Sequence, residues 1–365
     1  MAGIVQYVER HSPKQTRIVE KLRGKIIANE LLPGARLPNL LELEKEFRTS
    51  TTTILRALEH LNRTGYVRSV PRSGTFVSEN PPHLCHFGIF LPGAPNGGHW
   101  PQRYLEAWRL EALRLEGSAD PQGLKRRMLF FDESTHSGLA NGELIDKVES
   151  EQLAGLIFAE NPYAFSGTSV LKHPGLPRVA VCSKPIDGTS TISLDNRTLL
   201  DKGLQYLAER GRRRLAIITI SSYRYAMGTE ELIARVLDRG LTTHRHWVHG
   251  IDMRWPQWAA HCAEMLARCG GPDGPDSLFV IDDNLLHSAT CGLTAAGVRV
   301  PDDIEVVAHC NFPYPTPSTV PVKRVGFNIR YVARLAVGMI ERGRRGEEMP
   351  PVTTVSAVSE DEIES

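Results

Sequence analysis

The sequence has few of the features that mark several large classes of protein. Its six cysteines, at positions 85, 182, 262, 269, 291 and 310, include no Cys-x-x-Cys pair, so neither a disulfide framework nor a zinc ribbon is expected. No apolar run approaches the roughly 20 residues of a membrane helix, and no signal peptide or lipidation motif is present. We therefore expect a cytoplasmic protein with reduced thiols and no membrane partner.

Motifs of covalent, phosphoryl and dinucleotide chemistry are also missing. No Gly-x-Ser-x-Gly elbow, P-loop or Gly-x-Gly-x-x-Gly follows a predicted strand. One group of possible metal ligands lacks the i, i+4 spacing of a zinc site: His244, His246, His249, His261 and Cys262. Acidic pairs such as Glu230-Glu231 are far more often solvated than catalytic. We predict no enzyme activity, no cofactor and no metal site.

Positive charge is concentrated near the amino end. The whole chain has 43 Lys and Arg against 42 Asp and Glu, a formal net charge of +1. Residues 13–78 hold 12 Lys and Arg against 6 Glu, a net charge of +6, which leaves −5 for the remainder. This asymmetry favours contact between the first segment and a polyanion such as DNA.

Within residues 13–78, apolar side chains recur at helical spacing in three successive stretches. The first predicted helix covers residues 14–28 and carries basic residues on its other faces. A Pro-Gly turn follows, and Asn39 and Ser50 stand where N-caps would start a second and a third helix. The predicted buried stripes are Ile18, Leu22, Ile26 and Ile27; Leu40, Leu43 and Phe47; and Ile54, Leu58 and Leu61.

A hairpin is predicted after the third helix. Gly65 ends that helix, residues 66–70 and 75–77 have the composition of strands, and Arg72 and Gly74 lie at the tip. Such a unit can lay its last helix in the major groove of DNA and its basic hairpin beside it. We predict a DNA-binding winged helix over residues 13–78. The alternative is a winged helix that binds protein and exposes a solvated basic face.

The same segment resembles the winged helix-turn-helix of the GntR family of bacterial repressors. The resemblance rests on Pro-Gly-Ala-Arg-Leu-Pro at 33–38, Ser50 with Thr-Thr-Ile at 52–54, Gly-Tyr-Val at 65–67 and Gly-Thr-Phe-Val at 74–77. It implies that Arg36 contacts DNA and that Gly74 reaches the minor groove. The residues expected to contact DNA are Arg36, Ser50, Thr51, Thr52, Thr53, Arg56, Arg72 and Gly74.

The third helix departs from the family pattern. Thr51 and Leu55 occupy two positions where the family commonly has arginine. Bidentate recognition of guanine by arginine is therefore excluded at these two places. Arg56, the threonines and the shape of the DNA must account for more of the specificity, so the operator sequence of relatives cannot be transferred.

The length of 365 residues predicts more than one domain. Two prolines within residues 79–85 mark a short linker. Beyond it, short apolar runs alternate with helical patterns; the predicted strands are 86–91, 127–131, 155–159, 178–181, 215–220, 277–281 and 305–308. We predict an α/β fold in which an α+β winged helix precedes two lobes, each a doubly wound parallel sheet, with a ligand cleft between them.

Residues 86 to 345 resemble the effector domain of the LacI family, which has the fold of periplasmic sugar-binding proteins. The matching stretches include Phe-Gly-Ile-Phe-Leu-Pro at 87–92, Ile-Ser-Leu-Asp-Asn at 192–196 and Ala-Gly-Val-Arg-Val-Pro-Asp-Asp-Ile at 296–304. The resemblance implies a domain over residues 86–358. Its first lobe would comprise about 86–210 plus 312–340, and its second lobe about 211–311 plus the C-terminal segment. Arabinose-type repressors have a similar layout.

The ligand-binding positions of that family are only partly kept. The residues expected to face an effector are Asn96, Trp100, Asp195, Arg224, Asp282, Asp283 and Asn311. Arg224 is displaced from the family register, and Asn311 follows Cys310 where the family has aspartate. Structural roles are open alternatives: packing for Trp100, a helix N-cap for Asp195, and either role for Asp282 and Asp283.

Together the two resemblances imply a ligand-responsive transcriptional regulator, with repression as the family default. We expect a homodimer that binds double-stranded operator DNA, while a small molecule, a sugar or sugar derivative, closes the cleft and changes the DNA affinity. The alternative is a DNA-binding regulator whose cleft has lost its ligand and which acts constitutively or through a protein partner. A carbohydrate-processing protein would need catalytic carboxylates, which the sequence does not support.

Overall fold

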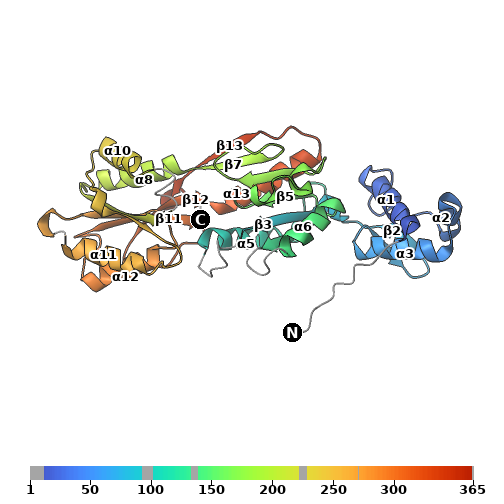
Figure 1. The fold of residues 1–365 in the computed structure, drawn as a ribbon, viewed down its shortest axis with the longest axis horizontal. Coiled ribbons are helices and arrows are strands. Elements are labelled where there is room, and N and C mark those ends of the chain that lie inside the picture. The colour runs from blue at the N-terminus through green and yellow to red at the C-terminus, as the bar shows by residue number, and fades with distance from the viewer. Residues whose placement is uncertain (1–11, 93–101, 133–138, 222–227, 270, 364–365) are drawn as a thin grey trace.

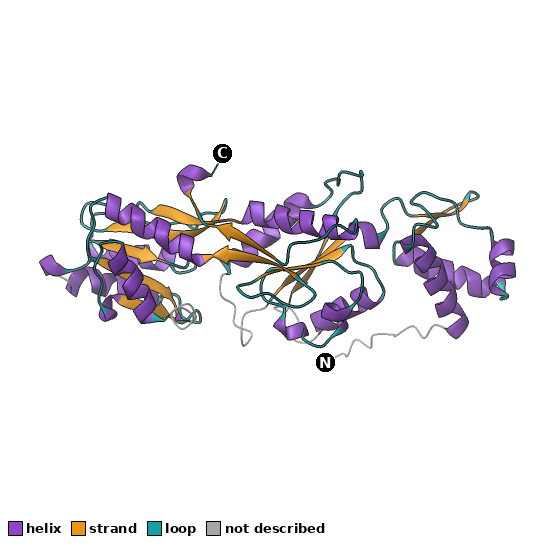
Figure 2. Ribbon diagram, turned by 90° about the horizontal axis from the view of Figure 1, so that it is seen from above, coloured by secondary structure: helices purple, strands orange, loops and turns teal. Residues whose placement is uncertain are grey.

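The protein is elongated, with a small head at one end and two lobes following along the long axis (Figures 1 and 2). The computed structural model describes residues 12–92, 102–132, 139–221, 228–269 and 271–363. The predicted fold class, a winged helix followed by two doubly wound parallel lobes, is confirmed. Among the described residues, no helix combines the length and hydropathy that crossing a membrane requires.

The head consists of three helices and a two-stranded wing, as predicted. Its elements are α1 (Pro13–Ile27), α2 (Leu40–Phe47), α3 (Thr51–Arg63), β1 (Val67–Val70) and β2 (Gly74–Val77). Leu22, Leu43, Ile54 and Leu61 are fully buried at its centre. The prediction that Leu40 is buried was wrong: it is 37% exposed, because it opens α2 beyond the edge of this small core.

The first lobe is built on a six-stranded parallel sheet in the order β13-β7-β6-β5-β3-β4. Helices α5 and α13 cover one face of the sheet, and α6 and α7 cover the other. The bounds are β3 (His86–Leu91), α5 (Arg103–Leu115), β4 (Arg127–Asp132), α6 (Leu139–Glu149), β5 (Gly155–Phe158), α7 (Ser169–Lys172), β6 (Arg178–Val181), β7 (Ser190–Asp195), α13 (Ile329–Arg344) and β13 (Val352–Ser356). A one-turn helix, α4 (Pro82–Cys85), joins the head to β3.

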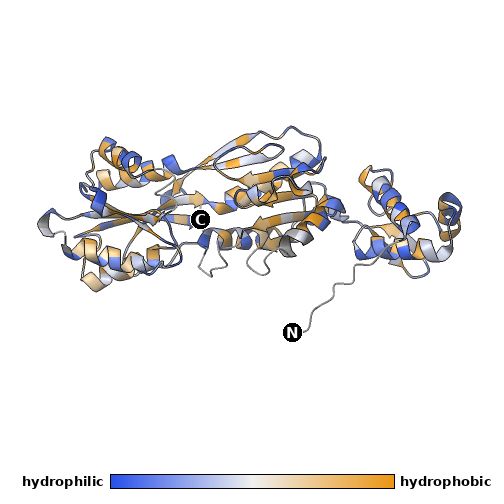
Figure 3. Cartoon of the chain, in the orientation of Figure 1, coloured by the Kyte–Doolittle hydropathy of each residue, from blue (hydrophilic) through white to orange (hydrophobic). Residues whose placement is uncertain are grey.

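The second lobe has a matching sheet in the order β14-β12-β11-β10-β8-β9, parallel except for β14. Helices α8 and α10 cover one face, and α11 and α12 cover the other. The bounds are α8 (Asn196–Glu209), β8 (Leu215–Ile220), α10 (Thr229–Asp238), β9 (Val248–Ile251), α11 (Trp258–Cys269), β10 (Ser277–Val280), α12 (Leu286–Ala296), β11 (Glu305–Phe312), β12 (Lys323–Asn328) and β14 (Val358–Ser359). Central strands such as β3 and β5 are mainly hydrophobic, as expected for a parallel sheet buried on both faces (Figure 3).

Three segments belong to the lobe opposite to the one predicted. β12 lies in the predicted first-lobe range 312–340 but pairs with β11 in the second sheet, whereas β13, in the C-terminal segment, pairs with β7 in the first. Helix α8, predicted within the first lobe, packs on the second sheet, where Gly203 lies against the ring of Phe279. The hydrophobic pattern of a segment shows that the segment is buried but not which sheet it joins. The lobe to which β12, β13 and α8 belong could therefore not be predicted from this pattern.

The chain passes between the lobes three times. The first two crossings run from a strand of one lobe into a helix of the other: β7 into α8, and β12 into α13. Each helix is capped at the crossing, because Asp195 Oδ1 accepts from Arg197 N at 3.0 Å and Asn328 Oδ1 accepts from Tyr331 N at 3.1 Å. The third crossing lies between β13 and β14, where Ala357 N donates to Thr198 Oγ1 at 2.8 Å.

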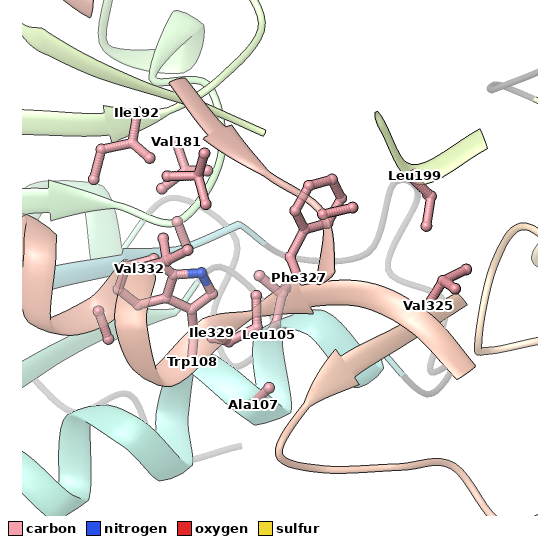
Figure 4. Packing of buried hydrophobic residues seen from close by; sticks show 14 of the residues in the cluster. Leu105, Ala107, Trp108, Val181, Ile192, Leu199, Val325, Phe327, Ile329 and Val332 are labelled. Atoms are coloured by element: carbon pink, nitrogen blue, oxygen red, sulfur yellow. The ribbon is translucent and has the colours of Figure 1, made fainter. Parts of the chain in front are cut away.

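One apolar cluster extends from the first sheet to the second. Trp108 of α5 is 1% exposed and lies near Val332 at the start of α13, with Phe327 of β12 beside them (Figure 4). The same cluster includes Val181 and Ile192 of the first sheet. The two lobes therefore share hydrophobic packing around the crossings.

Candidate DNA-binding face and effector cleft

Local interactions define both ends of α2. Asn39 and Glu42 form a capping box at the start of α2, with Glu42 N donating to Asn39 Oδ1 at 3.0 Å and Asn39 N donating to Glu42 Oε2 at 2.7 Å. The residue after α2, Arg48, is its C-cap and adopts a left-handed conformation with φ 49°. Helix α3 begins three residues later, at Thr51.

The predicted threonines at the start of α3 have different surroundings. Thr51 donates a hydrogen bond to the carboxylate of Glu44 in α2, so its hydroxyl holds the two helices together. Thr53 is half-buried, and its hydroxyl pairs with that of Ser50 at 3.1 Å. Ser50 occupies the N-cap position as predicted, but its side chain makes no capping bond to the backbone. Thr52 is left exposed at the front of the helix.

The wing is closed by the segment before α2. Leu37 N donates to Thr75 O at 2.9 Å and Val77 N donates to Ala35 O at 2.8 Å, so residues 35–37 pair with β2 through an isolated antiparallel bridge between Arg36 and Phe76. The side chain of Arg36 lies directly over Gly74, where an added Cβ would be 3.2 Å from Arg36 Nε. The two residues expected to contact DNA from distant parts of the segment are thereby neighbours.

Several basic residues of the head face solvent. Arg36, Arg56 and Arg72 are exposed, and none of them forms an ion pair within the part of the chain that the structure describes. Arg72 stands at the wing tip with φ 62°. By contrast, Lys21 and Lys25 of α1 share Glu46, whose carboxylate lies 3.2 and 2.8 Å from their ammonium groups. Among the described residues, Arg36, Arg56 and Arg72 therefore place unpaired positive charge on the side formed by α3 and the wing.

The head contacts the first lobe at the turn after α6. Arg23 Nε of α1 lies 3.0 Å from Glu151 Oε2, and the hydroxyl of Tyr66 donates to Glu151 O at 2.5 Å. His83 of α4 stacks on the ring of Tyr66 with centroids 5.7 Å apart, and burial lowers the pKa of His83 to about 4. The predicted linker is thus packed against both parts that it joins.

The candidate effector residues fall into three groups. Asp282, Asp283 and Asn311 lie together at the carboxyl ends of β10 and β11. Asp195 lies at the end of β7 and accepts the capping bond described above, which is the structural alternative for this residue. Asn96, Trp100 and Arg224 lie outside the described residues.

A buried polar cluster forms where β10 and β11 end. Asp283 is 1% exposed, accepts a hydrogen bond from Asn311 Nδ2 at 3.0 Å and lies 3.7 Å from His309 Nδ1. Burial and the neighbouring Asp283 raise the pKa of Asp282. Asn311 Oδ1 and the hydroxyl of Thr219 on β8 are buried and have no hydrogen-bond partner in the described ranges. Buried polar atoms normally have partners, so this edge of the sheet is suited to a polar ligand.

Helix α5 links this edge to the first lobe. Arg103 N, at its start, donates to Asn284 Oδ1 of the second lobe at 3.0 Å. Further along α5, the buried carboxylate of Glu111 accepts from Tyr314 Oη at 2.7 Å and from Arg330 Nε at 3.1 Å. Helix α5 therefore contacts both lobes close to the crossings between them.

His309 was not predicted as a member of this cluster. A signal was present, because His309 and Asn311 alternate with apolar neighbours and so share one face of β11. The contribution of Thr219 could not be found in the same way, since β8 reads as a continuous buried run.

His309 leads to a prediction about pH. Burial lowers the pKa of His309, but Asp283 and Asp282 raise it by more, so its net pKa lies above the ordinary value. A raised pKa in the folded state stabilises the protein below the ordinary histidine value of about 6.5, and this contribution is lost as the pH rises through the raised value. We expect His309→Gln to reduce the free energy of unfolding more at about pH 6 than at about pH 9.

Urea unfolding of both proteins across this range measures the difference. His246→Gln, a substitution of an exposed histidine, gives the baseline. If His309→Gln changes the free energy of unfolding equally at every pH, the raised pKa of His309 would be contradicted.

Comparisons with known proteins agree with this geometry. Residues 14–77 match the model of bacterial regulatory proteins of the gntR family, and residues 204–359 match that of the periplasmic binding protein-like domain. The mannosyl-D-glycerate transport/metabolism system repressor MngR of Escherichia coli (strain K12) is 36% identical over 69 residues, 19% of this chain and 29% of that protein. The arabinose metabolism transcriptional repressor of Geobacillus stearothermophilus is 30% identical over 74 residues, 20% of each chain. The chain thus spans less than a third of the length of either relative in these matches.

Solved structures match the body. A LacI family transcriptional regulator from Arthrobacter sp. FB24 in complex with lactose superposes with a TM-score of 0.58 at 18% identity, covering 76% of this chain and 97% of that one. A LacI family regulator from Lactobacillus casei with bound glucose gives 0.55 at 18% identity, over 76% and 98%. At these identities the likeness concerns the fold. The chain therefore joins a GntR-type winged helix-turn-helix head to a periplasmic-binding-protein-like body.

Proposed function

We propose that this protein is a ligand-responsive transcriptional regulator, acting as a repressor, whose head binds operator DNA. The observation that carries the proposal is the gathering of Arg36, the exposed side of α3 and the wing on one face of the part that matches the gntR family. Two relatives matched by the head are named as repressors of sugar-related metabolism. Bacterial operators lie in the cytoplasm, where the protein would act.

In this proposal α3 enters the major groove and the wing lies beside it. Arg36, Arg56 and Arg72 contact phosphate or base edges, Gly74 allows close approach of the wing, and Thr52 faces the bases. Thr51 has a supporting role, because its hydroxyl is already bonded to Glu44. Phosphate contacts release counterions, so binding should weaken steeply with salt.

Replacing either exposed arginine tests the DNA contact. Arg36→Ala and Arg56→Ala should each reduce affinity for the promoter region beside the protein's own gene by about tenfold or more, because a charged hydrogen bond is lost. Each should also reduce the salt slope by about one. Fluorescence anisotropy across a salt series measures both quantities. Arg299→Ala, on the exposed surface of the second lobe, is the control. Binding that ignores salt, or no binding, would refute the proposal.

The cleft is proposed to bind a sugar or sugar derivative. Asp282, Asp283 and Asn311 offer the carboxylate and amide groups that hydroxyl-rich ligands require, and Asn311 Oδ1 and Thr219 Oγ1 lack partners within the described part of the chain. Two structures with the same fold contain lactose and glucose. A ligand that closes the lobes favours one state of the body, and the contact at Glu151 transmits this change to the head.

A thermal-shift screen with sugars and sugar acids separates this proposal from a regulator whose cleft has lost its ligand. We expect at least one compound to raise the melting temperature, because it binds only the folded state. Thr219→Val, which removes a buried hydroxyl and keeps the shape, should weaken that response. Thr189→Val, also buried but at the opposite end of the first sheet, should not. If no compound raises the melting temperature, the result would favour the ligand-independent alternative.

We further infer that the protein is a homodimer, since one winged helix reaches one half-site only. Helix α5 exposes Leu110 (44%) and Leu113 (52%), which are three residues apart and share a face. Exposed leucines at this spacing suit a contact with a second copy.

The dimer contact can be tested by charge. The double variant Leu110→Glu with Leu113→Glu should be monomeric at micromolar concentration, and its operator affinity should fall by about 100-fold as the second half-site contact is lost. Sedimentation analysis gives the mass. Leu237→Glu, at a leucine of α10 that is 53% exposed, is the matched control. A monomeric native protein, or a variant that stays dimeric through this change, would exclude the α5 interface.

A further inference from the structure

A groove of about 700 Å³ opens on the face of the head that carries Arg36 and Gly74. The start of α2 lines it with Leu40 and Leu41, and α3 lines it with Leu55 and Glu59. Leu40, Leu41 and Leu55 are 37%, 68% and 49% exposed. Large apolar side chains are therefore gathered at the face that is proposed to meet DNA.

Leu55 lies on the exposed side of α3. Ile54, Ala57, Leu58 and Leu61 form the buried face of the helix. Thr52, Leu55 and Glu59 follow at i, i+3 and i+7, so they lie along one exposed face. A helix that lies in the major groove with this face toward the bases presents Leu55 to a base edge.

The chemistry of the major groove restricts what a leucine can recognise. Every base pair presents hydrogen-bonding groups there, but the 5-methyl group of thymine is the apolar group. A leucine side chain cannot pair with the polar edge of guanine or cytosine, and it desolvates that edge on contact. A thymine methyl in the same place buries apolar surface on both sides.

We propose that Leu55 is a specificity-determining residue, which selects thymine in each half-site by contact with its 5-methyl group. This rests on the proposed function, that the head binds operator DNA. DNA is favoured over a protein as occupant of the groove because Arg36 borders it and the segment carries a net charge of +6. Leu41 of α2 adds to the apolar lining of the same groove.

The test begins with selection of binding sites from a randomised duplex pool by the full chain. We expect a palindromic site with thymine at one fixed position of each half. Replacing that thymine by uracil removes only the methyl group, and should lower affinity about fourfold per half-site, the factor that one buried methyl supplies. 5-Methylcytosine in a site changed to cytosine should recover part of the loss that cytosine causes.

Two variants assign the effect to this side chain. Leu55→Ala should bind the thymine and uracil sites equally, and Leu55→Arg should select guanine in place of thymine. Leu32→Ala, at a leucine of the head that is 58% exposed and does not line the groove, should keep the full sensitivity to uracil.

The outcomes separate the two proposals. A chain that selects no site from the pool overturns the proposed function. A chain that selects a site but tolerates uracil at every thymine, or a Leu55→Ala variant that remains sensitive to uracil, overturns the role of Leu55 alone.

Discussion

The passage of the chain between two parallel sheets is the constraint on which the body depends. A parallel strand can be followed only by a crossover, and here two of these crossovers leave one sheet and end on the other. The capping bonds of Asp195 and Asn328 fix where each crossing helix starts. Trp108 and its neighbours then fill the space between the sheets. Opening or closing the lobes must therefore occur as rotation about these crossings, since separation would expose their shared core.

Much of the fold could be predicted from the sequence because its periodicities are local. The helices of the head and strands such as β3, β6 and β8 follow from apolar spacing and turn residues alone. β12 and β13 were different, because the sheet that each one joins depends on its neighbour in space. β13 pairs with β7, more than a hundred positions earlier in the chain, and β12 pairs with β11 of the second lobe. No local pattern shows which sheet such a strand joins, so the predicted lobe boundaries were wrong at β12 and β13.

The candidate sites divide in the same way. Arg36 and Gly74 could be named from the sequence, but their contact depends on the pairing of residues 35–37 with β2. Thr51 looked like a reading residue because it stands at the front of α3, and the carboxylate that engages it comes from a different helix. The cluster of Asp283, His309 and Asn311 required two strands to end side by side. Arg36, Gly74, Thr51, Asp283 and Asn311 could be named as site residues from the sequence, whereas His309 and the contacts between these residues could not.

The head lies at the extreme end of the long axis and rests on the first lobe near Glu151. Because α3 lies far from the crossings, a rotation of the first lobe displaces α3 more than it displaces any residue of the cleft. In a dimer, the two copies of α3 must be spaced by about 34 Å, one turn of the DNA helix, or a multiple of it. A small rotation within the body thus becomes an error of spacing at the DNA, and the elongated shape acts as the amplifier between the two.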